Sequence, residues 1–493
     1  MEFFIGVDIG TTGIRSGVFD ENFNLLGVGT GKSIVRKSEN DEIYQDPEEL
    51  LEETSIAVSE SIRSSSVNPK MVKAISFDGQ MAGIMGIDKT WNPVISYDSW
   101  LDTRCSQEVD FMKKKAGRAV VKKTGIIPSF NHGPKILWWK RNAPEKYKKI
   151  SKFIQPSVFI AGKLAGLKHE DAFIDWTYLH FTGFADNVNL KWDDLLTNTF
   201  GIEKEKLPKI VSPFTIIGHS NKEMSNKFGI KEGTLIAAGC GDTASSLLGS
   251  GVITPDSGAD IAGSASVFVL STDKPIFDYT GTIYSARSVI KDLWYCMSYI
   301  NGGGMNLEWF KNEFAQNRNF DDLNKEVNRI EPGCDGLIFI PHLDGRAYPP
   351  NSNLRGMWVG FRKKHTLYHF YRSILESVGY EYHIYLNRIR ELYGDKDLEW
   401  VVRVIGGGSR GKVWNQIKAD ILGVKYRDIE RDDVAILGQA FIAAIASGSK
   451  SNIKYIVSNV IKLGSMYLPK KEVSSRYELL FKRYKKLVEN FPY

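Results

Sequence analysis

The first twenty residues, Met1 to Asp20, constrain the fold most, because strand and turn signals alternate there over a short distance. Phe3 to Val7 is an apolar run typical of a buried strand. Asp8 to Gly13 follows as a turn, and Ile14 to Asp20 alternates as a second strand should. This order predicts a β-hairpin whose tip carries two glycines, two threonines and one aspartate.

The composition of this turn suits an anion. Gly10 and Gly13 can take positive φ and let the backbone approach a ligand closely. Backbone N–H groups in such a turn converge on an anion, and Thr11 and Thr12 add hydroxyl donors. Asp8 would repel a phosphate unless a divalent cation lay between them, so we interpret Asp8 as a direct or water-bridged Mg²⁺ ligand. An ordinary hairpin with a tight turn fits these residues equally well.

The bulk properties are those of a globular chain with two or more domains. The chain has 493 residues, of which 42% are hydrophobic and 25% charged. A net charge of +6 without a concentrated basic block does not favour nucleic acid as a partner. No apolar run is long enough to predict a membrane span, and the N-terminus does not resemble a secretion signal.

The cysteines indicate a reducing compartment. Their spacing matches no paired metal-ligand motif, so we expect free thiols and a cytoplasmic protein. They are Cys105, Cys240, Cys296 and Cys334.

After the hairpin, Leu25 to Val35 predicts a third strand. Asp46 then suits the N-cap of a helix that has Pro47 at its first position. Glu48 and Glu49 suit the positive end of that helix.

Residues 78–83 form a polar loop after the predicted strand Lys73–Phe77. Polar loops after strands bind small molecules in α/β proteins, and Gln80 can donate and accept toward a hydroxylated ligand. A plain turn is the alternative. Asp102 and Arg104 form a surface ion pair or order a loop at a cleft, and His132 fits a structural role better than a catalytic one.

Asp242 follows a strand that ends in Gly239-Cys240-Gly241 and heads a helix of small residues. Capping alone could explain it, since aspartate is a good N-cap. The flanking glycines and the Ala/Ser helix are small enough for another part of the protein to pack closely against them, which fits a hinge or the wall of a cleft.

Asp260 to Leu270 repeats the pattern of Asp8 to Gly13: Asp-Ile, a glycine, hydroxyls and a following strand. The repeat suggests a duplicated domain with two facing phosphate hairpins, with chance similarity as the alternative. Gly406 to Gly408 lies between a strand over 400–405 and a helix over 413–422. Such a triplet lets a ring or a phosphate lie against the backbone. It is not the dinucleotide fingerprint, which disfavours a Rossmann dehydrogenase.

In this order, these stretches resemble the FGGY carbohydrate kinases of the actin/hexokinase/Hsp70 superfamily over nearly the whole chain. The most specific part is Gly356–Phe361 with His369-Phe370 and Ser373–Glu376, which resembles the second family signature. Phe130–Asn142 resembles the first signature, from which His132 and Trp139 depart.

Within the family, the chain looks most like the xylulokinase branch, on the evidence of Glu42–Glu48, Gly79–Met81 and Pro134–Trp138. Xylulokinases usually carry a histidine where this chain has Ala82, at a position that resembles a sugar-contacting one. Without that donor, we expect a ketose other than D-xylulose, or a polyol, with activity spread over several epimers.

The resemblance implies an α/β protein with two ribonuclease H-like domains that face a central cleft. We expect an N-terminal domain over 1–250 and a C-terminal, nucleotide-binding domain over 251–493. It implies ATP and Mg²⁺ as cofactors and a small sugar as substrate, with no nucleic acid and no membrane, and it leaves a homodimer open.

The resemblance also assigns roles to residues. Asp242 is implied as the general base and as a substrate contact, and Asp8 as the metal-linked acid. The other implied positions are Thr11, Thr12, Gly263 and Ser264 in the phosphate hairpins, Gly407, Gly408 and Asn415 at the adenosine site, and Gln80, Met81, Asp102 and Phe130 at the sugar.

The implied reaction is ATP-dependent phosphorylation of a primary hydroxyl, with Asp242 as the proton acceptor. A glycerol- or erythritol-type polyol kinase is the alternative among enzymes. A catalytically silent sugar-binding regulator is the alternative from another class, and the presence of both Asp8 and Asp242 weighs against it.

Overall fold

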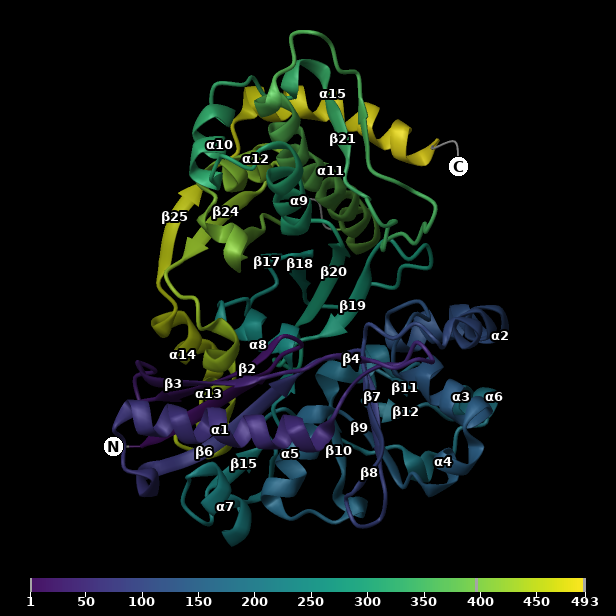
Figure 1. The fold of residues 1–493 in the computed structure, drawn as a ribbon, viewed down its shortest axis with the longest axis vertical. Coiled ribbons are helices and arrows are strands. Elements are labelled where there is room, and N and C mark those ends of the chain that lie inside the picture. The colour runs from purple at the N-terminus through teal and green to yellow at the C-terminus, as the bar shows by residue number, and fades with distance from the viewer. Residues whose placement is uncertain (1, 395–397, 491–493) are drawn as a thin grey trace. The chain divides into compact units, whose positions relative to one another are not determined.

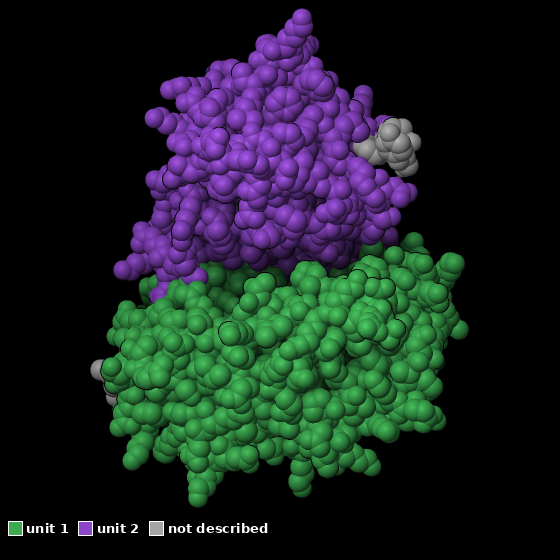
Figure 2. Space-filling model, viewed as in Figure 1, with its two compact units in different colours: residues 1–253, 286–293, 433–461 green, residues 254–285, 294–432, 462–493 purple. Residues whose placement is uncertain are grey.

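The computed structural model describes residues 2–394 and 398–490, which fall into two compact units. Unit 1 comprises segments 1–253, 286–293 and 433–461, and unit 2 comprises segments 254–285, 294–432 and 462–493 (Figure 2). Two segments from the second half of the chain therefore belong to unit 1. The division at residue 250 stays a prediction about functional domains.

Unit 1 is built on a mixed sheet that includes β2, β3, β6 and β15 (Figure 1). In this sheet β1 pairs with β2 antiparallel and with β6 parallel. The strands are, in order across the sheet, β14 (Ile216–His219), β15 (Leu235–Ala237), β6 (Val72–Gly79), β1 (Phe3–Ile9), β2 (Gly13–Phe19) and β3 (Leu25–Lys32). A short strand, β16 (Cys240–Gly241), also pairs with β6. The predicted hairpin is confirmed. The third strand ends at Lys32 rather than Val35, because its partner β2 begins at Gly13, opposite Lys32.

A second sheet of unit 1 follows the order β4 (Arg36–Lys37), β5 (Ile43–Gln45), β8 (Pro93–Asp98), β7 (Ile84–Ile87) and β9 (Lys152–Ile154). Short strand pairs join β10 (Phe173–Asp175) with β13 (Lys209–Val211), and β11 (Ala185–Asp186) with β12 (Lys191–Trp192).

The helices of unit 1 are α1 (Pro47–Ser65), α2 (Ser106–Thr124), α3 (His132–Asn142), α4 (Pro144–Lys149), α5 (Pro156–Ala165), α6 (Asp194–Phe200), α7 (Lys222–Phe228), α8 (Asp242–Gly249), α13 (Val434–Ala446) and α14 (Ile453–Val460). The predicted start of α1 is confirmed, since the Asp46 carboxylate accepts from the backbone N–H groups of Glu48 and Glu49.

Glycines let α13 reach the strands of unit 1 although the helix comes from the end of the chain. A Cβ on Gly6 of β1 would lie 1.9 Å from the Ile436 carbonyl oxygen, so only glycine fits there. A Cβ on Gly438 would lie 2.2 Å from the Ser245 carbonyl oxygen of α8. The sheet strands that carry Asp8 and Asp78 therefore rest directly on this helix.

Unit 2 has a sheet of the same kind. Its strands are, in order, β19 (Tyr284–Arg287), β20 (Trp294–Ile300), β18 (Ser266–Thr272), β17 (Ser257–Ala262), β23 (Val401–Ile405), β24 (Lys425–Ile429) and β25 (Leu463–Tyr467). The last two residues of β19 fall in the segment 286–293 that is grouped with unit 1. A separate pair joins β21 (Ile338–Ile340) with β22 (Met357–Val359). The helices are α9 (Gly304–Phe314), α10 (Phe320–Val327), α11 (Leu367–Tyr393), α12 (Lys412–Leu422) and α15 (Lys471–Glu489).

The two sheets share one topology. In unit 1 the order β3-β2-β1-β6-β15-β14 runs antiparallel through β1 and parallel from β1 to β15. In unit 2 the order β20-β18-β17-β23-β24-β25 shows the same directions. The weak sequence repeat at Asp8 and Asp260 therefore marks equivalent hairpins, β1–β2 and β17–β18.

Among the described residues, the helices are all too short or too polar to cross a membrane. All four cysteines are buried free thiols, as expected.

Candidate active site

The first hairpin lies at the end of β1, where Asp8 is partly exposed and Gly10 starts the turn. The Gly10 backbone N–H donates to the Gly13 carbonyl oxygen at 3.1 Å. Neither glycine uses the positive φ that is open to it. Gly10 is needed for close approach, because a Cβ there would lie 3.0 Å from the Gly13 carbonyl oxygen.

Thr11 links this turn to the polar loop after β6, whereas Thr12 is exposed. The Thr11 hydroxyl donates to Gln80 Oε1 at 3.0 Å and accepts from the Trp100 indole N–H at 2.9 Å. Gln80 Nε2 in turn donates to Gln45 Oε1 at 2.7 Å and to the Gly10 carbonyl oxygen at 3.3 Å. The phosphate turn and the predicted sugar loop thus form one hydrogen-bonded structure, in which the Gln80 amide is already committed to protein partners.

Two buried rings hold the backbone of this loop. The Tyr178 hydroxyl donates to the Gly79 carbonyl oxygen at 2.9 Å, and His132 Nε2 lies 2.6 Å from the Met81 carbonyl oxygen. A carbonyl only accepts, so His132 Nε2 carries the hydrogen. Burial lowers the pKa of His132 to about 4, so the ring is neutral at pH 7. The structural role expected for His132 fits these contacts.

Asp242 is the first residue of α8 and sits beside Met81. A Cβ on Gly241, the preceding residue, would lie 2.4 Å from Met81 Cε. The expected N-cap role was wrong: Gly241 is the N-cap, and Asp242 Oδ1 accepts from the backbone N–H and hydroxyl of its neighbour Thr243, at 2.5 and 3.1 Å. Within the part of the chain that the structure describes, Oδ2 has no hydrogen-bond partner.

The electrostatics favour a proton on Asp242. Burial, and then the negative charge of Asp8, raise the pKa of Asp242 to about 7. Burial also raises the pKa of Asp8. A carboxylate with a pKa near 7 and one uncommitted oxygen can act as a general base at neutral pH.

Asp102 and Phe130 are the remaining residues predicted for the sugar side of the site. Asp102 Oδ2 accepts from the Ile43 backbone N–H and from Arg104 Nε, both at 2.8 Å. This buried ion pair orders the loop rather than lying on the surface. Phe130 is 36% exposed and lies two residues before His132.

The sequence interpretation did not single out Asp78, Gln45 or Tyr178. Asp78 stands opposite Asp8 on the neighbouring parallel strand, so the two carboxylates share a face of the sheet. The only sequence signal was an aspartate at the end of each of two predicted strands. Its meaning depends on the register between β1 and β6.

In unit 2 the second hairpin meets the start of α9 and the glycine triplet. The backbone N–H groups of Gly304 and Met305 donate to the carbonyl oxygens of Gly263 and Ser264, at 3.0 and 3.1 Å. A Cβ on Gly408 would lie 2.6 Å from Ala262 Cβ, next to Gly263. The structure therefore brings the residues predicted for the second phosphate turn and for adenosine together.

The glycine triplet leaves open space at one position. Gly406 has φ 86° and approaches the Ala262 carbonyl oxygen, whereas a Cβ on Gly407 would meet nothing within 4 Å. Asn415 is buried, and its Nδ2 donates to the Ser409 carbonyl oxygen at 2.9 Å, so it supports the turn from behind. A hollow of about 290 Å³ beside the turn is lined by Ser409, Arg410, Asp428, Ile429, Glu430, Arg431 and Asp432.

Asp260, the counterpart of Asp8, is fully buried and forms an ion pair with Lys418 Nζ of α12. Its other oxygen accepts from the Tyr382 hydroxyl at 2.8 Å. Lys418 Nζ also lies 4.2 Å from the centre of the Trp414 ring. The carboxylate behind the second hairpin is therefore neutralised within the unit.

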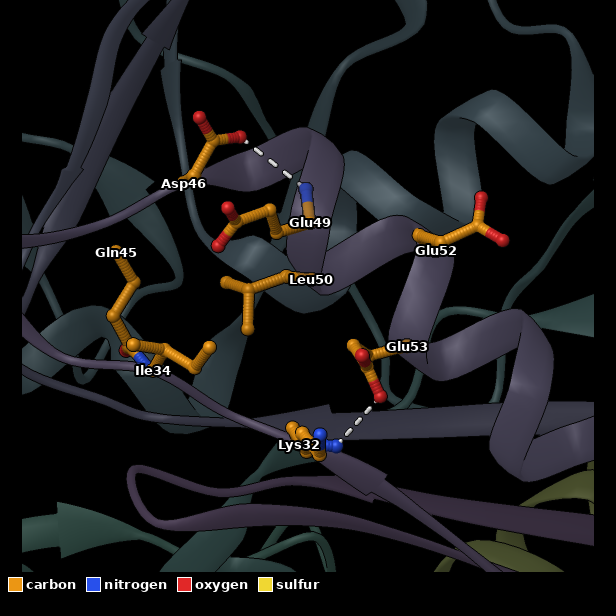
Figure 3. A pocket seen from close by; sticks show the side chains of 8 residues that line it. All are labelled: Lys32, Ile34, Gln45, Asp46, Glu49, Leu50, Glu52 and Glu53. Carbon is orange, nitrogen blue, oxygen red and sulfur yellow. Dashed lines mark hydrogen bonds between the residues drawn. The ribbon is translucent and has the colours of Figure 1, made fainter.

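Figure 3 shows another pocket of unit 1, of about 230 Å³, where the end of β3 meets the first turns of α1. Its acidic groups have partners: Glu49 pairs with Arg36, and Glu53 accepts from the Lys32 backbone N–H. Only Gln45 connects this pocket to the Gln80 network. The pocket is lined by Lys32, Ile34, Gln45, Asp46, Glu49, Leu50, Glu52 and Glu53.

Comparison with known proteins identifies the family of this chain. Residues 3–249 match the N-terminal domain of the FGGY family of carbohydrate kinases, and residues 259–447 match its C-terminal domain. The chain belongs to the FGGY family of carbohydrate kinases. As a carbohydrate kinase, it uses ATP to phosphorylate a small sugar.

Relatives of this FGGY kinase include the xylulose kinase of Bacillus subtilis, which is 27% identical over 99% of this chain and 97% of its own length. The gluconokinase of Bacillus licheniformis is 26% identical over 97% of this chain and 94% of its own length. The crystal structure of a ligand-bound xylulose kinase from Lactobacillus acidophilus superposes with a TM-score of 0.91, at 22% identity, over 99% of this chain and 98% of the other. The fold is therefore the two-domain FGGY kinase fold, of the actin/hexokinase-like class.

Proposed function

We propose that this FGGY kinase transfers the γ-phosphoryl group of ATP to a primary hydroxyl of an uncharged ketose. The observation that carries the proposal is the placement of Asp242: it has one uncommitted oxygen, and it lies beside Met81 of the sugar loop. Asp242 Oδ2 accepts the proton of the sugar hydroxyl as the hydroxyl oxygen attacks the γ-phosphorus.

The remaining predicted residues receive roles in the same scheme. The backbone N–H groups of the first turn and the exposed Thr12 hydroxyl bind phosphate oxygens, and Thr11, whose hydroxyl donates to Gln80, holds the turn. Gly263 and Ser264 do the same in the second hairpin, whose turn is exposed at Ser264. The open space at Gly407 supports a contact with adenosine there, with Gly408 beside it and Asn415 as the support of the turn.

The residues around Asp8 fit a divalent cation. The buried carboxylate of Asp78 has no hydrogen-bond partner, and its pKa is raised well above the usual range by burial and by the charges of Asp8 and Asp242. Such a set of oxygens is typical of a Mg²⁺ site. We therefore infer that Asp8 holds Mg²⁺, which when bound neutralises charge on the transferring phosphoryl group.

The surroundings of the sugar loop favour an uncharged substrate over a sugar acid. A sugar acid is bound best by a cation that is not already neutralised. The two cations next to Asp102, Lys135 and Arg104, are both in ion pairs with carboxylates, although Arg104 Nη2 makes no hydrogen bond among the described residues. Lys135 Nζ donates to Asp98 Oδ1 at 2.8 Å and to the Asp102 carbonyl oxygen at 2.8 Å, and Arg104 pairs with Asp102. We propose that Gln80, Met81, Asp102 and Phe130 form the sugar side of the site.

The buried free thiols support a reducing, cytoplasmic location. A homodimer remains a prediction.

The test is a coupled ADP-release assay over ketoses, polyols, aldoses and gluconate. We expect sugar-dependent turnover that is greatest with a ketose. Turnover with gluconate alone would contradict the substrate class, and the absence of turnover with every sugar would contradict the kinase activity.

A further inference from the structure

Asp78 is a buried carboxylate that the reaction described above does not use. It lies on β6, opposite Asp8 on β1 and opposite Cys240 on β16. Side chains at paired positions of neighbouring strands point to the same face of the sheet. The Asp78 carboxylate therefore points to the side where Asp8 and the start of α8 lie.

Within the described residues, Asp78 forms no ion pair; nearby Ser245 favours its charged form, whereas Asp8 favours its protonated form. Its side chain is fully buried, and neither carboxylate oxygen has a hydrogen-bond partner. Other buried acids of unit 1 are engaged: Asp98 pairs with Lys135, and Asp175 accepts from the backbone N–H and hydroxyl of Thr177. A buried carboxylate without a partner is costly, so it persists where a ligand or a proton compensates it.

The neighbours of Asp78 add negative charge. The charged groups that act on it most strongly are Asp8 and Asp242. Residues 2–394 and 398–490 contain no cluster of three or more His, Cys, Asp or Glu arranged to hold a metal, so this is not a closed metal site. Mg²⁺ is usually held by one or two carboxylates together with phosphate oxygens and water, so two carboxylates beside a phosphate turn suit it.

We propose that Asp78 is a second carboxylate that, beside Asp8, binds the divalent cation accompanying ATP. The inference rests on the proposed function, in which ATP brings that cation to the first hairpin. With Asp8 and Asp78 as the cation ligands, Asp242 stays free to accept the proton of the sugar hydroxyl. The competing explanation is a proton shared between Asp8 and Asp78, with no metal ligand at residue 78.

The experiment measures the affinity of the full-length protein for Mn²⁺ alone by electron paramagnetic resonance, which reports free Mn²⁺ and does not depend on turnover. It compares the unmodified protein with Asp78→Asn and Asp78→Ser, the second in case the first fails to fold. Asp8→Asn is the positive control. Asp175→Asn is the matched control, because it removes a buried carboxylate of the same unit.

We expect one Mn²⁺ site in the unmodified protein and a loss of affinity of about ten-fold or more in both Asp78 variants. Asp175→Asn should keep the affinity of the unmodified protein. Unchanged Mn²⁺ affinity in a folded Asp78 variant, or no Mn²⁺ site in the unmodified protein, would overturn the inference.

These outcomes are independent of the sugar assay. Sugar-dependent turnover combined with unchanged Mn²⁺ affinity in Asp78→Asn would reject the second ligand and leave the kinase function standing. An Asp78-dependent Mn²⁺ site in a chain that turns over no sugar would reject the proposed function alone.

Discussion

The hairpins of the two units have the same topology, but the residues that surround their aspartates differ in charge. Asp8 and Asp260 both stand near the end of the first strand of a hairpin, and both have a parallel strand beside them. The residue opposite Asp8 on that strand is Asp78, whereas the residue opposite Asp260 is Val404. Lys418 then pairs with Asp260 from α12.

The difference supports our proposal that the first hairpin binds a cation from outside. Behind the second hairpin the chain supplies its own ammonium group, so the aspartate there is a structural charge. At the first hairpin Asp8 has Arg15 opposite it on β2, which favours its charged form, and a second carboxylate, Asp78, opposite it on β6. We propose that a cation from outside neutralises the carboxylate pair. The two hairpins therefore share a backbone topology, and we propose that they differ in role, with the chemistry and the sugar in unit 1 and the nucleotide in unit 2.

The largest expected effect comes from breaking the internal ion pair of unit 2. Lys418→Met leaves Asp260 buried without its cation, which should lower the free energy of unfolding by about 3 to 5 kcal/mol. Denaturant titration measures this loss. Adding Asp260→Asn should recover part of it, because the unpaired charge is removed. A double variant that is no more stable than Lys418→Met would show that the loss of stability does not come from the unpaired Asp260 charge.

The next largest effect tests the acids of unit 1. Asp242→Asn should lower kcat by roughly a hundred-fold or more and leave sugar binding largely intact, because the general base is lost. In the unmodified protein, kcat/KM should fall as the pH drops below about 7, since the base must be deprotonated and its pKa is about 7. Steady-state kinetics over about three pH units around neutrality measure the kcat of Asp242→Asn and the pH dependence of kcat/KM in the unmodified protein. Near-normal turnover in Asp242→Asn would remove this residue from the mechanism.

Part of the fold and of the candidate site could be predicted from the sequence alone. The hairpins, the start of α1 at Asp46 and the helix over 413–422 depend on local patterns, and the structure has all three. The opposition of Asp8 and Asp78 depends on the register between strands about seventy residues apart, which no local pattern contains. The predicted N-cap role of Asp242 shows the same limit, because the sequence does not determine which residue begins the helix. The Asp242 side chain accepts from Thr243 instead of capping α8.

Long-range packing explains the other differences. The placement of α13 in unit 1 depends on close contacts of Gly6 and Gly438 with distant segments. Asp102 could be recognised as a partner of Arg104 from the sequence, but not as an acceptor for Ile43, which lies on β5.

A smaller effect sharpens the assignment of adenosine to unit 2. Gly407→Val places a branched side chain in open space, so it should fold normally and raise KM for ATP about ten-fold, the equivalent of about 1.4 kcal/mol of binding. Kinetics with ATP and sugar varied in turn measure the effect. An increase in KM for the sugar alone would mean that the two sites are assigned the wrong way round.

The smallest effect concerns the sugar loop of unit 1. Ala82→His should shift relative kcat/KM toward D-xylulose by a few-fold to tens-fold, if one hydrogen bond of about 1 kcal/mol is gained. The comparison requires kcat/KM for D-xylulose and its epimers in both proteins. A strong preference of the unmodified protein for D-xylulose over its epimers would contradict our interpretation of Ala82.

The most direct test of the contrast between the two hairpins is the response of thermal stability to Mg²⁺ in the absence of nucleotide. At a Mg²⁺ concentration ten times the dissociation constant, binding to the Asp8–Asp78 pair should stabilise the unmodified protein by about 1.4 kcal/mol and raise its Tm. Asp78→Asn should start from a higher Tm without Mg²⁺ at pH 8, because it removes a buried carboxyl group that has no hydrogen-bond partner, and should gain little when Mg²⁺ is added. Asp260→Asn should keep the full response to Mg²⁺. Our proposal would be contradicted if Mg²⁺ left the Tm of the unmodified protein unchanged, or if it raised the Tm of Asp78→Asn as much as that of the unmodified protein. Either result would mean that the first hairpin does not bind its cation from outside through Asp78.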